Sequence, residues 1–528
     1  MHYIAWLIAQ GAVPYRDAFD MNLPGAYLIH WAVLSIGGAG DLAWRLFDLA
    51  WLAATCGLLF AYGGGPGDRG AAAASAVLFA LYHLSGGAWR VGQRDFLLCL
   101  FLLGGAWGVA RSLEQGGALR PLVWAGLVLG AGMTVKPQAG LYWLGCAAAA
   151  AWGAWRVGQR DFLLCLFLLG GAWGVARSLE QGGARRPLVW AGLALGAGMT
   201  VKPQAGLYWL GCAAAAAWGA WRERRSVVAG AGAVLGAGLL VPALVFGWLG
   251  WRGGLGAFMA ILTGYLLPLY SHVGRVSALQ ALGAHRHGWL VLVFLGVLGL
   301  LALLGPAPEG SGARRALALL GVGYGWLHFS LQGKGWEYHL YPLAFFLCAL
   351  APFALASTGF ASERGPGPAR RRVAALVVLG ALVVTLGAKG VEAVDAPWIA
   401  DKAGRVAAVS RDLAPLLAAG DTAQVMDVTE GGVHVLLRLG VRQPTRFIYD
   451  FHFFHDQADP RIKALQTEFV AGLDSARPAA IVVMRDTWNR PGYERLREVP
   501  GLMPLLDRAY TLAAEGDVYR IYAKRAGS

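Results

Sequence analysis

The sequence predicts a polytopic α-helical membrane protein that ends in a soluble α/β domain. Of its 528 residues, 57% are hydrophobic and only 14% are charged, whereas water-soluble proteins carry about a quarter charged residues. Long apolar runs fill the region up to residue 390 and are separated by short polar segments. After residue 390 the apolar runs shorten and alternate between strand-like and helix-like patterns, which is typical of a small sheet covered by helices.

The expected membrane domain covers residues 46–390. A helix needs roughly 20 apolar residues, or about 17 at the short end, to cross a bilayer. Apolar runs that reach or approach this length lie at 46–63, 70–85, 96–112, 226–248, 288–305, 315–331, 342–358 and 373–390. Together with shorter runs they predict about 10 spans, plus about 3 more from a duplicated segment.

The duplicated segment is a near-identical tandem repeat. Residues 87–152 and 153–218 match throughout except at Leu119/Arg185 and Val128/Ala194. Natural repeat proteins instead show many diverged copies with capping repeats. We therefore interpret the repeat as a recent duplication or a sequence artefact. Each copy holds three apolar runs, and an odd number of added spans would reverse the side on which every later segment lies.

The net charge of +14 lies in the membrane region, because the chain from Lys389 onward carries 18 basic and 18 acidic residues. Much of the excess forms short clusters between apolar runs: "RERR" (222–225), "GARR" (312–315) and "ARRR" (369–372). Such clusters mark cytoplasmic loops, so the charge indicates membrane orientation rather than nucleic-acid binding. With one repeat copy, this rule places residues 1–45 and the domain 391–528 on the outer face.

The tail contains four strand-like runs: "AQVMDV", "RFIYDF", "AAIVVM" and "VYRIYAK". They are rich in β-branched and aromatic residues and alternate with helical patterns such as "DPRIKALQTEFVAGL". The six cysteines lie in apolar runs and have neither disulfide nor metal-ligand spacing. The run "DFHFFHD" (450–456) resembles a metal motif, but two histidines three apart are more often packing residues. We therefore predict no metal site there.

The first candidate site is the N-terminal stretch "GAVPYRDAFDMNLPG" within residues 1–45, which concentrates Arg16, Asp17 and Asp20 beside two prolines. Carboxylates on an outer-face loop can act as a general base or bind a divalent cation such as Mg²⁺ or Mn²⁺. The alternative is an ordinary polar loop. In "VGQRD", Arg94 and Asp95 sit where a helix enters the membrane, either as an interfacial anchor or as part of a phosphate site.

Two later loops add further candidates. In "LQGKGWEYHLYPL", four functional side chains fall within six residues: Lys334, Glu337, Tyr338 and His339. A plain connection rarely holds so many, so we predict a substrate site in which Lys334 and His339 bind phosphate. The loop "GYLLPLYSHVG" contributes Tyr270 and His272, for which an interfacial aromatic belt is the alternative.

Four of these motifs, in this order, resemble the GT-C integral-membrane glycosyltransferases: "GAVPYRDAFDMNLPG", "RDFLL", "MTVKP" and "KGWEYHLYP". The group with the greatest similarity is the bacterial one that includes the protein O-mannosyltransferases and the lipid A aminoarabinose transferase. The resemblance implies transfer of a sugar from a polyprenyl-phosphate donor to a lipid, glycan or protein acceptor. It implies an inverting displacement at the outer face of the bacterial inner membrane, with a periplasmic C-terminal domain.

The resemblance also implies roles for individual residues. Asp95 matches the second acidic position of the family, and Lys334 and His339 match its late phosphate-side loop. Asp17 and Asp20 lie in the first-loop motif, while the family's first span and an Asp-Glu pair precede the point at which this sequence begins. We therefore expect a truncated start. The implied reaction requires no cofactor, although a divalent cation is compatible with these carboxylates.

Two other hypotheses compete with a glycosyltransferase. A secondary transporter would also be polytopic, but transporters place ionisable residues at the membrane midplane, whereas most charges here lie at the ends of apolar runs. A soluble outer domain after the last span is also unusual for a transporter. The repeat and the missing first span also fit an inactive remnant of a glycosyltransferase. The expected partners are the polyprenyl-phosphate sugar, its acceptor and membrane lipid, with no nucleic acid.

Overall fold

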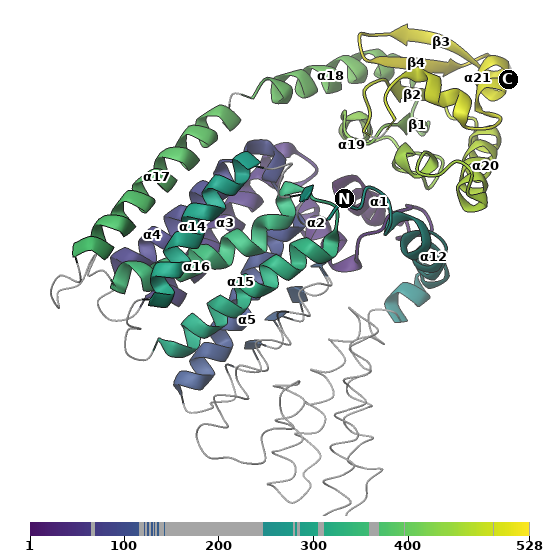
Figure 1. The fold of residues 1–528 in the computed structure, drawn as a ribbon. Helices are drawn as coiled ribbons and strands as arrows, with labels where there is room; N and C mark the ends of the chain where they lie inside the picture. The colour runs from purple at the N-terminus through teal and green to yellow at the C-terminus, as the bar shows by residue number, and fades with distance from the viewer. Residues whose placement is uncertain are drawn as a thin grey trace, which may run out of the picture. The chain divides into compact units, whose positions relative to one another are not determined.

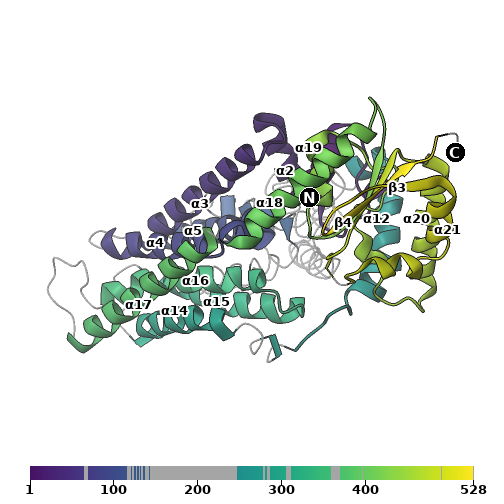
Figure 2. The same ribbon diagram turned by 90° about the horizontal axis from the view of Figure 1, so that it is seen from above.

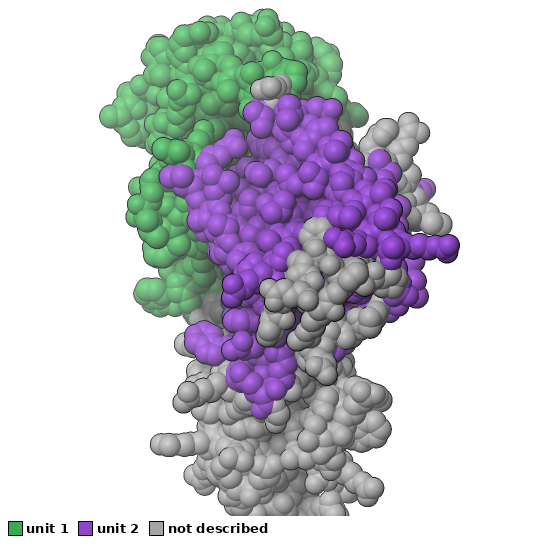
Figure 3. All heavy atoms as spheres, turned by 90° about the vertical axis from the view of Figure 1, so that its left-hand side faces the viewer, with its two compact units in different colours: residues 1–44, 248–273, 395–528 green, residues 45–247, 274–394 purple. Residues whose placement is uncertain are grey.

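The computed structural model describes residues 1–64, 69–115, 247–277, 280–281, 286–304, 311–357, 369–394, 396–488 and 490–526, with single residues between 121 and 142. These residues form two compact units, coloured separately in Figure 3. Unit 1 comprises residues 1–44, 248–273 and 395–528, and unit 2 comprises residues 45–247 and 274–394. The second repeat copy, residues 153–218, and the span expected at 226–248 lie outside the described residues, except for the last two residues of that span.

Unit 2 is a bundle of apolar helices. Its helices are α3 (Asp41–Gly63), α4 (Arg69–Leu84), α5 (Arg94–Glu114), α14 (Arg286–Leu304), α15 (Gly312–Gln332), α16 (Tyr341–Ser357) and α17 (Ala369–Val394), with short 3₁₀ turns η1 (Gly87–Arg90) and η4 (Glu337–Leu340). Figures 1 and 2 show α14, α15 and α16 side by side, and α16 also packs against α4. These helices cover the spans that the sequence predicts at 46–112 and 288–390.

The centre of the bundle is α16. It is apolar around its whole circumference, and almost all of its side chains are buried, which is typical of a helix inside a large core or a membrane bundle. Close packing is visible at Gly63, where an added Cβ would come within 2.6 Å of Pro352 Cγ. By contrast, α17 exposes apolar side chains such as Val377 and Val384, as expected of a helix that faces lipid.

Three helical stretches among the described residues are long and apolar enough to cross a membrane: Asp41–Gly63, Glu337–Ser357 and Ala369–Leu416. Shorter apolar helices lie at Leu255–Tyr270 and Leu290–Leu304. The mostly helical, apolar architecture confirms the class of fold that the sequence predicts. The number of about 10 plus about 3 spans stays a prediction.

Unit 1 combines the tail with two segments from far earlier in the chain. The early segments contain α1 (His2–Ala9), α2 (Pro24–Gly37), α12 (Leu255–Ile261) and the π-helix η3 (Leu262–Tyr270). The tail contains α18 (Pro397–Leu413), η5 (Ala414–Leu416), α19 (Gly432–Leu439), η6 (Asp450–Phe453), α20 (Pro460–Ala476), η7 (Tyr493–Glu498) and α21 (Leu502–Ala509). The Tyr3 hydroxyl donates to the Val441 carbonyl at 3.0 Å, and the Phe19 amide donates to the Arg446 carbonyl at 2.7 Å.

The tail also contains a four-stranded sheet in the order β1-β2-β4-β3. Its strands are β1 (Ala423–Met426), β2 (Ala480–Met484), β3 (Tyr510–Glu515) and β4 (Tyr519–Lys524). β1 and β2 are parallel with Ala423 opposite Ala480, whereas β4 is antiparallel to both β2 and β3. Every residue of β1 and β2 is buried, as expected for parallel strands covered on both faces.

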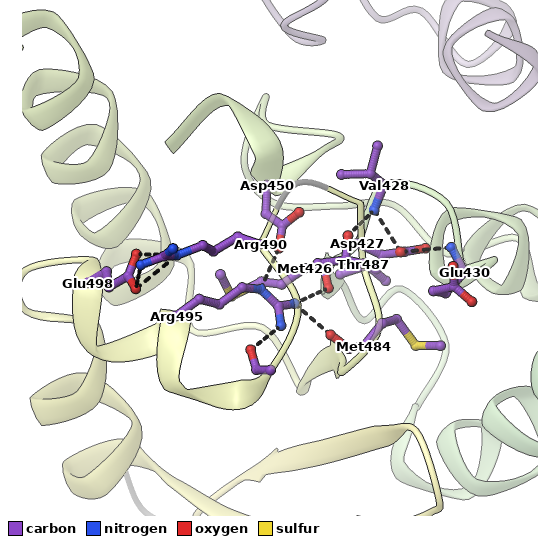
Figure 4. A network of polar contacts seen from close by, with 12 residues as sticks. Met426, Asp427, Val428, Glu430, Asp450, Met484, Thr487, Arg490, Arg495 and Glu498 are labelled. Atoms are coloured by element: carbon purple, nitrogen blue, oxygen red, sulfur yellow. Dashed lines mark hydrogen bonds and ion pairs between the residues drawn. The ribbon is translucent and has the colours of Figure 1, made fainter. Parts of the chain in front are cut away.

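A buried arginine joins the carboxyl ends of the two parallel strands (Figure 4). The Arg495 guanidinium donates to the carbonyls of Met426, at the end of β1, and Met484, at the end of β2, at 3.2 and 2.6 Å. It also donates to the carboxylate of Asp450 at 3.1 Å and to the Gly492 carbonyl at 2.8 Å. One side chain thus saturates strand-end carbonyls that would otherwise be buried without donors.

The strand predicted at "RFIYDF" (446–451) is wrong. This segment is buried but irregular, and it ends in the 3₁₀ turn η6. The carbonyl of Phe447 accepts hydrogen bonds from the side-chain amides of Gln424 and Gln443 at 3.1 and 3.2 Å. Buried side chains thus replace a neighbouring strand as hydrogen-bond partners. The strand β3 was not predicted, because its exposed sequence "YTLAAE" resembles a helix more than a strand.

Candidate functional site

A buried carboxylate is the centre of the candidate site in unit 2. Asp95 lies in the first turn of α5, where a helix N-terminus favours negative charge, and its side chain is fully buried. One carboxylate oxygen bonds to Nε2 of His328 at 2.6 Å. The other forms an ion pair with Nζ of Lys136, which is itself buried. Both oxygens of Asp95 are therefore occupied.

The partners of Asp95 on α15 lie along one face of the helix. Tyr324, His328 and Gln332 are spaced four residues apart, so their side chains lie one above another. The Tyr324 hydroxyl lies 3.2 Å from Nδ1 of His328, and the Gln332 side-chain nitrogen lies 3.2 Å from Nε2. This column fixes the orientation of the His328 ring against Asp95.

The turn between α15 and α16 contains four of the predicted residues. The ring of His339 is buried, with its centroid 6.4 Å from that of His328. The ring of Tyr338 faces Lys136, with 5.9 Å between its centroid and Nζ. Glu337 accepts a hydrogen bond from Nη2 of Arg90 at 2.7 Å. His339 and Tyr338 thus lie near His328 and Lys136, the two partners of Asp95. Glu337 instead contacts Arg90, which precedes Asp95 in the chain.

Lys334 lies on the same turn, between two left-handed glycines, Gly333 (φ 61°) and Gly335 (φ 63°). The side chain of Arg275 packs over Gly333, where an added Cβ would come within 3.0 Å of Cγ and 3.2 Å of Nε. Partial burial and the neighbouring charge of Arg275 lower the pKa of Lys334 to about 8. Two cations share this turn, which is the kind of site that attracts a phosphate.

The first-loop residues form a separate constellation in unit 1. Arg16 binds Asp17 through two hydrogen bonds of 2.8 Å, and the Val13 amide donates to the same carboxylate at 2.8 Å. The hydrogen bond from Arg16 holds the pKa of Asp17 below its usual range. The side chain of Asp17 is 36% exposed. An ionised, reachable carboxylate therefore lies on this loop.

Asp20 is hydrogen-bonded to other residues of the first loop and of α2. It is buried and accepts hydrogen bonds from the Tyr27 hydroxyl at 2.9 Å, from the side-chain amide of Asn22 at 2.9 Å and from the Met21 amide at 2.7 Å. The loop it anchors is strained, because Tyr15 adopts a left-handed conformation (φ 70°) that non-glycine residues rarely adopt. The hydrogen bonds of Asp20 hold the first loop, and its role as a catalytic carboxylate stays a prediction.

Tyr270 and His272 lie in unit 1, at the end of η3. The Tyr270 ring packs 6.4 Å from that of Tyr265, whereas His272 is exposed. The Tyr265 hydroxyl lies 2.8 Å from one ring nitrogen of His452 and 2.8 Å from one of His455. The histidines of "DFHFFHD" thus contact a tyrosine. The described residues contain no group of three or more His, Cys, Asp or Glu placed to hold a metal ion.

The structure brings some predicted residues together and adds others. Asp95, Glu337, Tyr338 and His339 converge in unit 2, with Arg94 half-buried beside Asp95. The partners for which the sequence predicted no site role are Lys136, which lies in the motif "MTVKP", and His328, Arg90 and Arg275. Lys136 and His328 were detectable in principle, because ionisable residues inside apolar runs are costly and usually functional.

Comparison with known proteins shows which family part of the chain resembles. Residues 22–160 match the family model described as dolichyl-phosphate-mannose-protein mannosyltransferase. The resemblance to the GT-C membrane glycosyltransferases is confirmed. The matched glycosyltransferase segment contains both Asp95 and Lys136. A comparison with curated proteins finds no match.

Two solved structures are similar to this glycosyltransferase-like chain, both of ArnT from Cupriavidus metallidurans. The apo structure is 13% identical and covers 95% of this chain and 87% of its own, with a TM-score of 0.33. The structure bound to undecaprenyl phosphate is 15% identical and covers 98% of this chain and 90% of its own, with a TM-score of 0.34.

Proposed function

We propose that the chain is an inverting glycosyltransferase that uses a polyprenyl-phosphate-linked sugar as its donor. The observation that carries the proposal is the buried cluster of Asp95, Lys136 and His328 beside the cationic turn that holds Lys334. The family match supports the donor class, because its description names a sugar carried on a polyprenyl phosphate. The membrane architecture supports a lipid-linked substrate.

In this reaction the acceptor hydroxyl oxygen forms a bond to the anomeric carbon of the sugar. The bond between that carbon and the phosphate oxygen breaks, and its electron pair leaves with the lipid phosphate. Lys334 and Arg275 stabilise the charge on the departing phosphate, which is the electrostatic contribution that such transfers need most. The reaction requires no cofactor in this account.

The three predicted carboxylates have different roles in this account. Asp17 lies in unit 1 and is partly exposed and ionised, which is the form in which a carboxylate can accept a proton. The proton of the acceptor hydroxyl passes to water. Asp95 is occupied by Lys136 and His328, so it positions the cationic groups around it. Asp20 holds the first loop in place. We place the reaction at the outer face of a bacterial inner membrane, and in the form with one repeat copy we place residues 391–528 in the periplasm.

The test of this proposal is substitution of Lys334 in the purified full-length chain. Lys334→Ala should slow release of polyprenyl phosphate from a sugar-loaded donor about tenfold or more, because a charge-assisted contact to phosphate is worth about 1.5–3 kcal/mol. Lys334→Arg should retain most of the rate, since the charge remains. Lys463→Ala, at an exposed position of α20, is the matched control. Equal rates for all four proteins would place the phosphate elsewhere.

A further inference from the structure

A second buried polar chain lies next to the Asp95 cluster but shares no residue with it. Oδ2 of Asp48, on α3, lies 2.9 Å from Nε2 of His83, near the end of α4. Nδ1 of His83 lies 2.8 Å from the hydroxyl of Tyr341, the first residue of α16. Oδ1 of Asp48 accepts the Gly92 amide at 2.8 Å. We call Asp48, His83 and Tyr341 the Asp48 chain.

The three members of the chain are complementary hydrogen-bonding groups. A carboxylate accepts, an imidazole can donate through one ring nitrogen and accept through the other, and a tyrosine hydroxyl can do either. The exposed fractions of Asp48, His83 and Tyr341 are 3%, 2% and 0%. Ionisable groups inside a membrane bundle are costly and usually serve a function.

Gly92 connects the Asp48 chain to the functional segment. It adopts a left-handed conformation (φ 67°) in the turn between η1 and α5, three residues before Asp95. The His83 ring also packs against the ring of Phe96, with 4.0 Å between centroids. Asp48 and His83 thus contact the chain on both sides of Asp95.

Residues 90–95 also contact the turn between α15 and α16 through Arg90. Arg90, at the end of η1, donates to Glu337 at 2.7 Å, and its guanidinium lies 5.5 Å from the centre of the Tyr341 ring. Tyr341 directly follows η4, which carries His339. One chain of hydrogen bonds therefore joins α3, α4, the start of α5 and the start of α16.

We propose that Asp48 is a positioning residue: through Gly92 it holds residues 90–95 so that Asp95 meets Lys136 and His328. Its effect on catalysis rests on the proposed function, whereas its effect on the segment does not. A displacement of about 1 Å in a catalytic group can cost about 100-fold in rate. Loss of the Gly92 contact should therefore lower kcat and leave the donor KM nearly unchanged.

The test uses the full-length protein in detergent with two readouts. The first is amide hydrogen exchange of the peptide 84–93, which begins before the repeat and so differs in sequence from the second copy. Asp48→Leu should raise exchange at Gly92 at least tenfold, and Asp48→Asn, which keeps an acceptor for that amide, should raise it less. The second readout is donor turnover, where Asp48→Leu should lower kcat about 10- to 100-fold with KM within about threefold.

Ser75→Ala is the matched control. The Ser75 hydroxyl donates to the Cys348 carbonyl at 2.7 Å, so it joins the same two helices, α4 and α16, without contacting residues 90–95. It should change neither the exchange of peptide 84–93 nor kcat. Tyr341→Phe retains the Gly92 contact and should lower kcat less than Asp48→Leu does.

The two readouts separate the possible failures. Unchanged Gly92 exchange in Asp48→Leu would overturn the positioning role, as would faster exchange with an unchanged kcat. If the wild-type chain turns over no donor, the proposed function fails, and the exchange measurement alone decides whether Asp48 holds the segment. If Asp48→Leu does not fold, Asp48→Ala, which also removes the acceptor of the Gly92 amide, supplies both readouts under the same criteria.

Discussion

The contribution of the ion pair between Lys136 and Asp95 to stability can be tested by substitution, and the second repeat copy supplies the control. Lys136→Met removes the ammonium and leaves a buried carboxylate with His328 as its remaining partner. Breaking a buried pair from one side costs about 3–5 kcal/mol. Because the 2.6 Å contact with His328 persists, we expect the lower end of that range, about 3 kcal/mol or roughly a 100-fold change in the folding equilibrium.

The copied segment offers an internal control, because Lys202 and Asp161 are the equivalents of Lys136 and Asp95. Lys202→Met should change stability by less than about 1 kcal/mol if the first copy forms the cluster. The double variant Lys136→Met/Asp95→Leu should be less destabilised than Lys136→Met alone, because replacing a whole buried pair by apolar groups is often nearly neutral.

The assay is denaturation of the purified protein by SDS titration, followed by tryptophan fluorescence. A large loss for Lys136→Met, a small one for Lys202→Met and partial recovery in the double variant would support the assignment. The reasoning is refuted if Lys202→Met is the costly substitution, or if the double variant loses as much as the sum of its single changes.

Three further predictions concern the tail and the topology. A reporter fused after Ser528 should lie outside in a chain lacking residues 153–218 and inside in the full chain; an outside reporter in both would show that the copy does not add three spans. Arg495→Met should destabilise unit 1 by about 3–5 kcal/mol, since it leaves a buried carboxylate unpaired; a change below about 1 kcal/mol in chemical denaturation would contradict this. Burial raises the pKa of Asp450 to about 6, above its ordinary value near 4. Preferential protonation of Asp450 in the folded state therefore adds fully to the free energy of unfolding below about pH 4, and this contribution is lost as the pH rises through about 6. Asp450→Asn should remove that part of the pH profile, and an identical profile in the variant would count against it.

Much of the helical architecture was predictable, because apolar runs of sufficient length become helices wherever lipid or a bundle surrounds them. The motifs also identified residues that the structure brings together, such as Asp95 and His339, which are separated by more than two hundred positions. Charged side chains are rare in apolar sequence, so they stand out even without knowledge of the fold.

The partners of these residues could not be predicted. Lys136 lies in the motif "MTVKP", but nothing in a single sequence indicates that it meets Asp95. Asp48 and His83 are isolated polar residues on separate helices, and only the packing of α3 against its neighbours joins them. The strand expected at 446–451 failed for a related reason, since buried glutamine side chains took the place of a neighbouring strand.

The most direct test of the central claim is the release of polyprenyl phosphate from a radiolabelled polyprenyl-phosphate sugar, with bacterial membranes as the source of acceptors. The purified chain and its Asp161→Asn variant should consume the donor at similar rates, and Asp95→Asn should be at least about tenfold slower, because one lost charge-assisted contact is worth about 1.5 kcal/mol or more. Donor that remains intact with the wild-type chain would contradict the proposed function. Activity that survives in Asp95→Asn but disappears in Asp161→Asn would show that the first copy does not form the site.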